Sequence, residues 1–283
     1  MIRFATPGDH MKLKSLWQDI FGDSREAVED YFARRHHDGN MLVEAQGDDI
    51  AGMLSMLPLR LTSPGQSFPA RYIYAVATDV KYRNQGISTR LLDYAHAYMQ
   101  SRGEAAAVLV PASPSLFDFY GKRGYQTAFL LDIIRFNAGD LPPCPKDGRF
   151  SPCSPGAYAR LRDRAFLSSR LYACWDEKAV AYAVWALGPE GGVTRLFAGS
   201  GEGCAAWEWR EGTVLVRELA LVNMDVPAAL AVLHQALKAP AYQVRLPASS
   251  LPGANTLPFG MIRWLNPEPA LLGEPPYLSL ALD

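Results

Sequence analysis

Cysteine and histidine are scarce in this sequence. Its 283 residues include four cysteines and five histidines, with no CxxC pair and no histidine at metal-ligand spacing from a cysteine. This pattern argues against a zinc site or a thioredoxin-like motif, so we expect reduced thiols and no bound metal. His36 and His37 are adjacent on a predicted helix end, where we expect them to be solvated.

An excess of one charge is also absent. The 28 Lys and Arg residues nearly balance 29 Asp and Glu residues, giving a formal net charge of -1. Such a chain has no field that attracts nucleic acid. No apolar run approaches the roughly 20 residues that span a bilayer, and the first residues lack a signal-peptide pattern. We therefore expect a cytoplasmic protein without a membrane or nucleic-acid partner.

Several catalytic and nucleotide-binding motifs are missing. The sequence has no GxxxxGK[ST] run and no GxSxG elbow, which excludes a P-loop and the usual serine-hydrolase arrangement. The segment GSGEG at 199–203 is followed by residues that alternate like strands, so it predicts a hairpin turn rather than a dinucleotide-binding loop. With 49% hydrophobic and 20% charged residues, the composition is that of a folded globular protein.

The first half of the chain predicts a mixed α/β fold. Gly22 is expected to end the first helix, and Asp23 to cap the second with Glu26 three residues later. The element order β-α-α-β-β-β-α-β-α-β combines hairpins with crossovers, which favours a mixed sheet flanked by helices. The last of these strands is expected at residues 127–136.

A linker and a second domain follow. Residues 137–156 are rich in Pro, Gly and Asp, so we predict domains at 1–140 and 150–283 with the boundary near Pro145. The second half repeats a strand-helix-strand order, and YQVRLPASS echoes AVLVPASPS from the first half. This repetition favours a degenerate duplication.

The loop before the helix at 87–102 has the chemistry of an anion site. The first N–H groups of a helix have no internal partner and lie at the positive end of its dipole. Gly86 would let phosphate oxygens approach the backbone, and Arg83 could pair with them. Ser88 and Thr89 add hydroxyls in the first helical turn. The alternative is a glycine that only shapes a turn.

These residues resemble a known loop. Arg83 to Ser88, after a strand, is similar to the acyl-CoA loop of the GCN5-related N-acetyltransferases (GNAT), whose pattern is Arg or Gln, two residues, Gly, one residue, then Gly or Ala. Ser88 departs from the last position. The segment LVPASPSLFDFYGKRGY is similar to the second half of the family's fold, so the resemblance covers about residues 1–137.

The resemblance implies tandem acyl-CoA N-acyltransferase folds and acetyl-CoA as co-substrate. Pantetheine would pair with the edge of a strand, the diphosphate would lie on loop and helix N–H groups, and the acyl group would point toward a serine-containing turn. The residues implied in these three roles are, in order, Val76, Ala77 and Thr78; Arg83, Asn84, Gln85, Gly86, Ile87, Ser88 and Thr89; Ser113 and Ser115.

The family's acid corresponds to Tyr120, which would donate a proton to the departing CoA thiolate. A core aromatic is the plain alternative for this residue. No base is fixed by the sequence. Asp79 is one candidate, against its interpretation as a loop acid or helix cap, and Glu44 is a weaker one.

The two-domain layout also resembles the enhanced-intracellular-survival type of acetyltransferase, in which the terminal carboxylate enters the catalytic site. That resemblance implies Asp283 as a further candidate base, although this chain has no room for that type's third, sterol-carrier-like domain. The second domain offers Asp225 and no glycine where the first has its loop. We therefore expect it to bind no CoA and to form a wall of the acceptor pocket.

Together these features predict an N-acetyltransferase that moves an acetyl group from acetyl-CoA to a primary amine in a ternary complex. The acceptor amine is left unidentified, and a homo-oligomer is compatible with the sequence. The alternative is a protein that binds CoA or acyl-CoA without turnover, as a sensor or interaction module.

Overall fold

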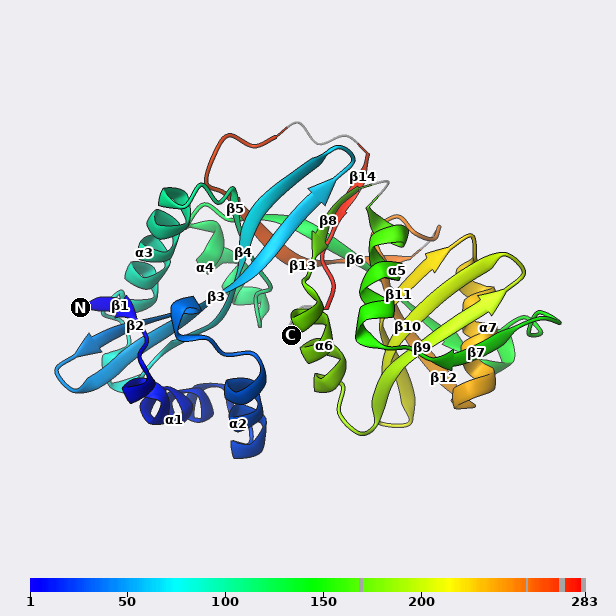
Figure 1. The fold of residues 1–283 in the computed structure, drawn as a ribbon, viewed down its shortest axis with the longest axis horizontal. Helices are drawn as coiled ribbons and strands as arrows, with labels where there is room; N and C mark the ends of the chain where they lie inside the picture. Colours follow the sequence, from blue (N-terminus) through cyan, green and yellow to red (C-terminus); the bar gives the residue numbers. More distant parts are fainter. Residues whose placement is uncertain (168–169, 253, 270–272, 281–283) are drawn as a thin grey trace. The chain divides into compact units, whose positions relative to one another are not determined.

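The computed structural model describes residues 1–167, 170–252, 254–269 and 273–280. Figure 1 labels its helices and strands. The chain divides into two compact units. Unit 1 contains Met1–Arg60, Phe68–Gln126 and Met261–Pro269, and unit 2 contains Leu61–Ser67, Thr127–Gly260 and Ala270–Asp283. No helix among the described residues is long and apolar enough to cross a membrane.

Unit 1 is built on a mixed sheet with strand order β1-β2-β3-β4-β5-β13. β2 is antiparallel to both β1 and β3, whereas β4 and β5 run parallel because α3 connects them. The strands are β1 (Ile2–Phe4), β2 (Met41–Gln46), β3 (Asp49–Ser63), β4 (Gln66–Thr78), β5 (Ala106–Leu109) and β13 (Asn255–Trp264).

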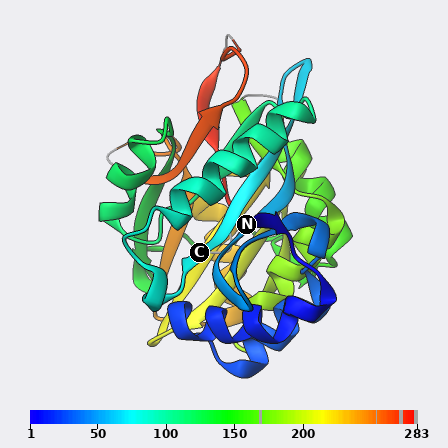
Figure 2. The same cartoon turned by 90° about the vertical axis from the view of Figure 1, so that its left-hand side faces the viewer.

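Helices cover both faces of this sheet. Alternate residues of a strand point to opposite faces. Leu54 and Met56 of β3 share a core cluster with Leu91 of α3, whereas the hydroxyl of Ser55 lies 3.4 Å from that of Tyr31 in α2. Figure 2 shows α3 crossing in front of β3 and β4. The helices are η1 (Pro7–Asp9), α1 (His10–Phe21), α2 (Arg25–Arg34), η2 (Asp38–Asn40), η3 (Val80–Tyr82), α3 (Ile87–Ser101) and α4 (Pro114–Gly121).

A segment from near the end of the chain completes unit 1. Residues 261–264 of β13 pair antiparallel with β5, so that Met261 lies opposite Leu109. Arg263 donates from Nη1 to the carbonyl oxygen of Arg123 (2.8 Å) and to Nδ1 of His96 (2.9 Å). The strand expected at 127–136 forms β6 (Gln126–Asn137), which belongs largely to unit 2. The two compact units therefore do not coincide with the predicted domains, residues 1–140 and 150–283. Nearly all of β6 belongs to unit 2, whereas residues 261–264 of β13 belong to unit 1.

In unit 2 the strand order is β6-β12-β11-β10-β9-β7, and β14 pairs with β8. β11 and β12 run parallel with α7 between them in the chain, as β4 and β5 do around α3. Residues 199–203 fall in the β9–β10 hairpin, as predicted. The remaining elements are η4 (Ala138–Asp140), β7 (Arg149–Pro152), α5 (Pro155–Phe166), β8 (Arg170–Cys174), α6 (Glu177–Ala186), β9 (Gly191–Ala198), β10 (Gly201–Arg210), β11 (Thr213–Val222), α7 (Val226–Leu237), β12 (Ala241–Pro247) and β14 (Glu274–Tyr277).

The interior of unit 2 holds a buried ion pair. Arg162 and Glu218 are 1% and 0% exposed, and the guanidinium donates to both carboxylate oxygens at 2.5 and 3.0 Å. The hydroxyls of Tyr158 and Tyr277 also donate to this carboxylate. A buried charge is tolerated only with such partners, so the cluster is a structural centre of the unit.

Candidate functional site

The predicted anion site is the junction between β4 and α3. Gly86 is the N-cap of α3 and adopts a left-handed backbone with φ of 75°. Asn84, two residues earlier, is also left-handed with φ of 62°. Glycine takes this conformation without steric cost, and asparagine takes it more readily than most residues. No side chain among the described residues caps α3, so the N–H groups of its first turn are open to an external acceptor.

Arg90 braces this loop from the first turns of α3. Its Nη1 donates to the carbonyl oxygen of Gln85 at 2.6 Å. Its Nη2 and Nε donate to the two carboxylate oxygens of Glu44 in β2, at 2.5 and 3.2 Å. The hydrogen bond with Glu44 raises the pKa of the Arg90 guanidinium. Glu44 is therefore committed to an ion pair, and sequence reasoning missed Arg90 because its partner lies 46 residues away.

The helix lies very close to the strands beneath the loop. A Cβ added to Gly52 of β3 would lie 2.6 Å from Cγ2 of Ile87 and 2.9 Å from the carbonyl oxygen of Ala77. Ile87 is itself buried, with 1% of its surface exposed. It can therefore offer a ligand only its backbone, while its side chain fixes the start of α3 on the sheet.

The end of β4 presents an open edge beside this helix start. Registered pairs between β4 and β5 run only from Ala70–Ala106 to Tyr72–Val108 among the described residues. Ala75 then takes a left-handed backbone with φ of 50°, which is unusual for a non-glycine residue in a strand. Beyond it, residues 76–78 continue β4 without a registered partner in β5. Unpaired main-chain groups at a strand edge can bind an extended ligand.

Tyr120 lies on α4, near its end. The ring is 7% exposed and packs edge-on against Phe119 (centroids 5.1 Å apart) and Tyr125 (5.6 Å). Burial raises the pKa of Tyr120 to about 12, against a smaller lowering effect of Arg123. Its hydroxyl is therefore protonated at neutral pH. No other described residue forms a hydrogen bond with that hydroxyl.

Arg123 joins the two helices of the site. Its guanidinium donates to the hydroxyl of Thr89 in α3 and to the carbonyl oxygen of Phe119 in α4 (2.6 Å), and it lies 3.5 Å from the centre of the Phe119 ring. The Thr89 side chain, expected to meet the cofactor, is thus already occupied by Arg123. Sequence reasoning did not single out this arginine, although it falls within the GKRGY segment.

Among the other predicted site residues, some side chains are available to a ligand and others already form hydrogen bonds within the protein. The Arg83 side chain is exposed and makes no ion pair with another described residue. Ser113 is the N-cap position of α4, and its hydroxyl lies 3.1 Å from that of Ser115. Asp79 accepts a 2.8 Å hydrogen bond from the N–H of Lys81 and so caps η3. Asp283 lies outside the described residues.

The chain matches known proteins in sequence over its first part and in fold over most of its length. Residues 1–128 match the family model described as an acetyltransferase (GNAT) domain. No curated protein matches the sequence.

Three solved structures illustrate the likeness in fold. The GCN5-related N-acetyltransferase from Anabaena variabilis is 17% identical, with 94% of this chain and 73% of that chain covered and a TM-score of 0.76. Eis1 from Mycobacterium abscessus is 15% identical, with coverage of 94% and 74% and a TM-score of 0.71. A tandem GNAT protein from the clavulanic acid biosynthesis pathway is 12% identical, with coverage of 95% and 100% and a TM-score of 0.55.

The predicted mixed α/β fold and the resemblance read from the loop are therefore confirmed. Residues 1–128 thus match the acetyltransferase (GNAT) domain family, and the fold of the chain is similar to that of solved GCN5-related N-acetyltransferases.

Proposed function

We propose that this protein transfers the acetyl group of acetyl-CoA to a primary amine, which attacks the thioester directly while both substrates are bound. The observation that carries this proposal is the β4–α3 junction. There, an uncapped helix start at Gly86, a free guanidinium at Arg83 and an open strand edge at 76–78 lie consecutively along the chain. GNAT proteins use acetyl-CoA, which has a diphosphate and an amide-bearing arm suited to these features.

In this proposal the diphosphate accepts hydrogen bonds from the N–H groups of residues 85–88. These groups lie at the positive end of α3, and the Arg83 guanidinium adds a permanent charge. The left-handed Gly86 leaves room for phosphate oxygens, since it carries no Cβ. Arg90 contributes indirectly, because its bond to the carbonyl of Gln85 holds the loop on α3.

The pantetheine arm would extend β4 at Val76, Ala77 and Thr78 through main-chain hydrogen bonds. Its sulfur would then approach Tyr120, with Ser113 and Ser115 at the turn near the acetyl group. The link that Arg123 makes between α3 and α4 supports this arrangement, because it holds the phosphate-binding helix and the Tyr120 helix as one piece.

Tyr120 supplies the leaving-group proton in this proposal. The amine nitrogen attacks the thioester carbonyl and forms a tetrahedral intermediate, which collapses by breaking the carbon–sulfur bond. The phenol then gives its proton to the departing thiolate, so that free CoA and an acetamide leave the site. The raised pKa of Tyr120 keeps this proton in place until the thiolate forms.

A protein base is not part of the proposal. Asp79 is engaged as a cap and Glu44 as the partner of Arg90, so neither carboxylate is free to accept the proton of the amine. We assign that proton to solvent. Only unit 1 binds CoA in this scheme, because the start of α7 is already capped by the Asp225 carboxylate, which accepts from the N–H of Ala228 at 2.7 Å.

The loop assignment is tested by measuring acetyl-CoA affinity calorimetrically in Gly86→Glu. This change puts bulk and negative charge where the diphosphate would lie, so binding is expected to be lost. Gly47→Glu is the matched control, because Gly47 is also an exposed glycine of unit 1 with positive φ (60°). Equal affinities in the two variants would refute the assignment.

Turnover is tested by following free thiol from acetyl-CoA with a library of amines. Tyr120→Phe is expected to slow thiol release by roughly 100-fold or more while leaving acetyl-CoA affinity nearly unchanged. An unaltered rate would remove the acid role. Tight acetyl-CoA binding without thiol release from any amine would favour the rival function, a CoA-binding protein without turnover, which the lack of a free base would explain.

A further inference from the structure

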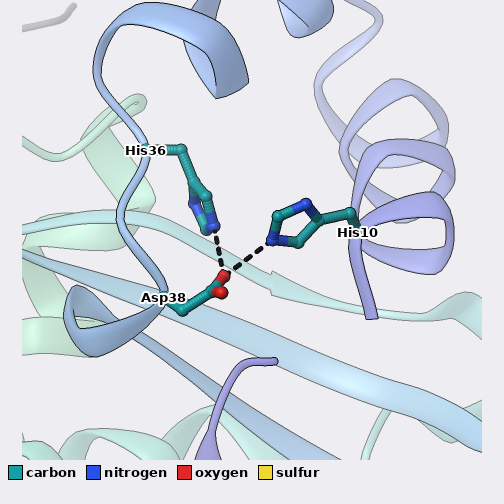
Figure 3. A group of neighbouring side chains, drawn as sticks. All are labelled: His10, His36 and Asp38. Carbon is teal, nitrogen blue, oxygen red and sulfur yellow. Dashed lines mark hydrogen bonds and ion pairs between the residues drawn. The ribbon is translucent and has the colours of Figure 1, made fainter. Parts of the chain in front are cut away.

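Two histidines and an aspartate converge in unit 1, and the proposed function uses none of them. His10 is the first residue of α1, His36 follows α2, and Asp38 is the first residue of η2. Both imidazoles point at the same carboxylate oxygen (Figure 3): Nε2 of His10 lies 2.7 Å and Nε2 of His36 2.8 Å from Oδ1 of Asp38. The expectation that His36 is solvated was wrong, since its side chain is only 5% exposed.

The surrounding residues hold these side chains in place. The His36 ring stacks on Phe32 with centroids 4.4 Å apart, and the edge of His10 packs against the same ring at 5.6 Å. The two imidazoles are nearly perpendicular, with centroids 5.0 Å apart. Next to Asp38, Nδ1 of His37 accepts from the N–H of Gly39 and caps η2. The three donor atoms are thus preorganised rather than carried on free side chains.

The donor set suits a transition-metal ion. Two imidazole nitrogens and one carboxylate oxygen are ligands that Zn²⁺ and related divalent ions accept. Ligands bound to one such ion at about 2.0–2.1 Å lie roughly 3 Å apart. The two N···O separations here are 2.7 and 2.8 Å, and the three ligand atoms all lie within 4.8 Å of one another. An ion could therefore take the place of the protons in these two hydrogen bonds, with some movement of the side chains.

One side of the cluster is open to solvent. The side chains of His10 and Asp38 are 35% and 28% exposed, in contrast to His36. Water can therefore enter from that side and fill the coordination positions that the protein leaves open. The nearby ammonium of Lys14 forms an ion pair with Glu29, which offsets its repulsion of a cation.

We propose that His10, His36 and Asp38 form a binding site for a divalent transition-metal ion, with Zn²⁺ the best fit. The ion would join α1, the residues that follow α2, and η2. Trp17 of α1 and Tyr31 of α2 pack on Tyr74 of β4, with centroids 5.6 and 5.8 Å apart. The site thus stabilises the helical layer next to Ala75. It is independent of acetyl transfer, and it contradicts the expectation from the sequence that no metal binds.

The test is a Zn²⁺ titration of the full-length, EDTA-treated protein, using calorimetry or competition with a chromogenic chelator. The wild type is expected to bind one ion, and Asp38→Asn to bind it roughly 100-fold more weakly or worse, because a ligand matters more than the outer partners that change affinity by about 10–100-fold. His37→Asn is the matched control. It removes the adjacent, exposed imidazole but keeps a side chain that can cap η2, so its affinity should equal that of the wild type.

A second measurement separates loss of the site from loss of the fold. Zn²⁺ should raise the melting temperature of the wild type and of His37→Asn but not of Asp38→Asn, and all three should melt alike in EDTA. Should Asp38→Asn fail to fold, His10→Gln gives the same comparison, since His10 is partly exposed and glutamine suits a helix. A folded wild type that binds no Zn²⁺ below millimolar concentrations, or equal binding by the wild type and a folded ligand variant, overturns the proposal.

Discussion

His96 should make the stability of unit 1 depend on pH above the range where most carboxylates titrate. It lies buried on α3, between Tyr125, whose hydroxyl is 2.8 Å from Nε2, and Arg263, whose Nη1 is 2.9 Å from Nδ1. A guanidinium can only donate, so Nδ1 accepts and the proton of the neutral ring lies on Nε2. Burial, and then the charge of Arg263, lower the pKa of His96 to about 3.

The sign and size of the effect follow from this shift. An unfolded histidine titrates near pH 6.5, so below that pH the unfolded chain binds a proton that the folded chain does not. The contribution of the neutral His96 ring to the free energy of unfolding is therefore fully present above about pH 6.5, and it decreases as the pH falls toward 3. Between pH 7 and pH 5 the His96 contribution to the free energy of unfolding should fall by about 2 kcal/mol.

The assay compares the wild type with His96→Gln at pH 7 and pH 5. Hydrogen exchange of the α3 amides is the readout, because it reports on unit 1 without the transition of unit 2. Both proteins contain the same carboxylates, so the difference between their pH dependences isolates His96. An identical loss of α3 protection in the two proteins, or an NMR titration of the His96 ring near pH 6.5, would refute the reasoning.

Two further predictions concern packing. Gly52→Val should lower the free energy of unfolding by about 1–3 kcal/mol and weaken acetyl-CoA binding, because the valine side chain would displace Ile87 from the sheet. Urea unfolding measures the first effect and calorimetry the second. An unchanged acetyl-CoA affinity would show that the contact between Gly52 and Ile87 does not hold the loop in its binding conformation. Arg162→Met should destabilise unit 2 by about 3–5 kcal/mol, since it leaves the Glu218 carboxylate buried and unpaired. Urea unfolding against the exposed control Arg164→Met would show this, and similar losses in the two variants would contradict it.

Sequence reasoning succeeded where the determinants are local. The loop from Arg83 to Gly86 lies between a strand and an amphipathic helix within about 25 residues, and Gly22 ends α1 in a left-handed conformation as predicted. The cap of α2 was predicted one residue too early. Ser24 accepts from the N–H of Ala27, whereas Asp23 accepts from Nε1 of Trp17. The Asp23 carboxylate is thus engaged by the Trp17 indole, and its neighbour Ser24 serves as the cap.

Contacts between distant parts of the chain could not be predicted in the same way. An apolar alternating segment indicates a strand but not its neighbour, so the pairing of residues 261–264 with β5 left no trace in the local pattern. The brace from Arg90 to Glu44 and the convergence of His10 on His36 and Asp38 also join segments that are far apart in sequence. Only the fold brings these residues together.

The late arrival of β13 has a consequence during synthesis. The outer neighbour of β5 consists of residues 261–264, so this strand leaves the ribosome only after the roughly 150 residues that separate it from β5 have been translated. At about 5–20 residues per second, the nascent N-terminal half waits several seconds or longer with the β5 edge exposed. A bare strand edge is a template for intermolecular pairing, so this interval is when the growing chain most needs a chaperone.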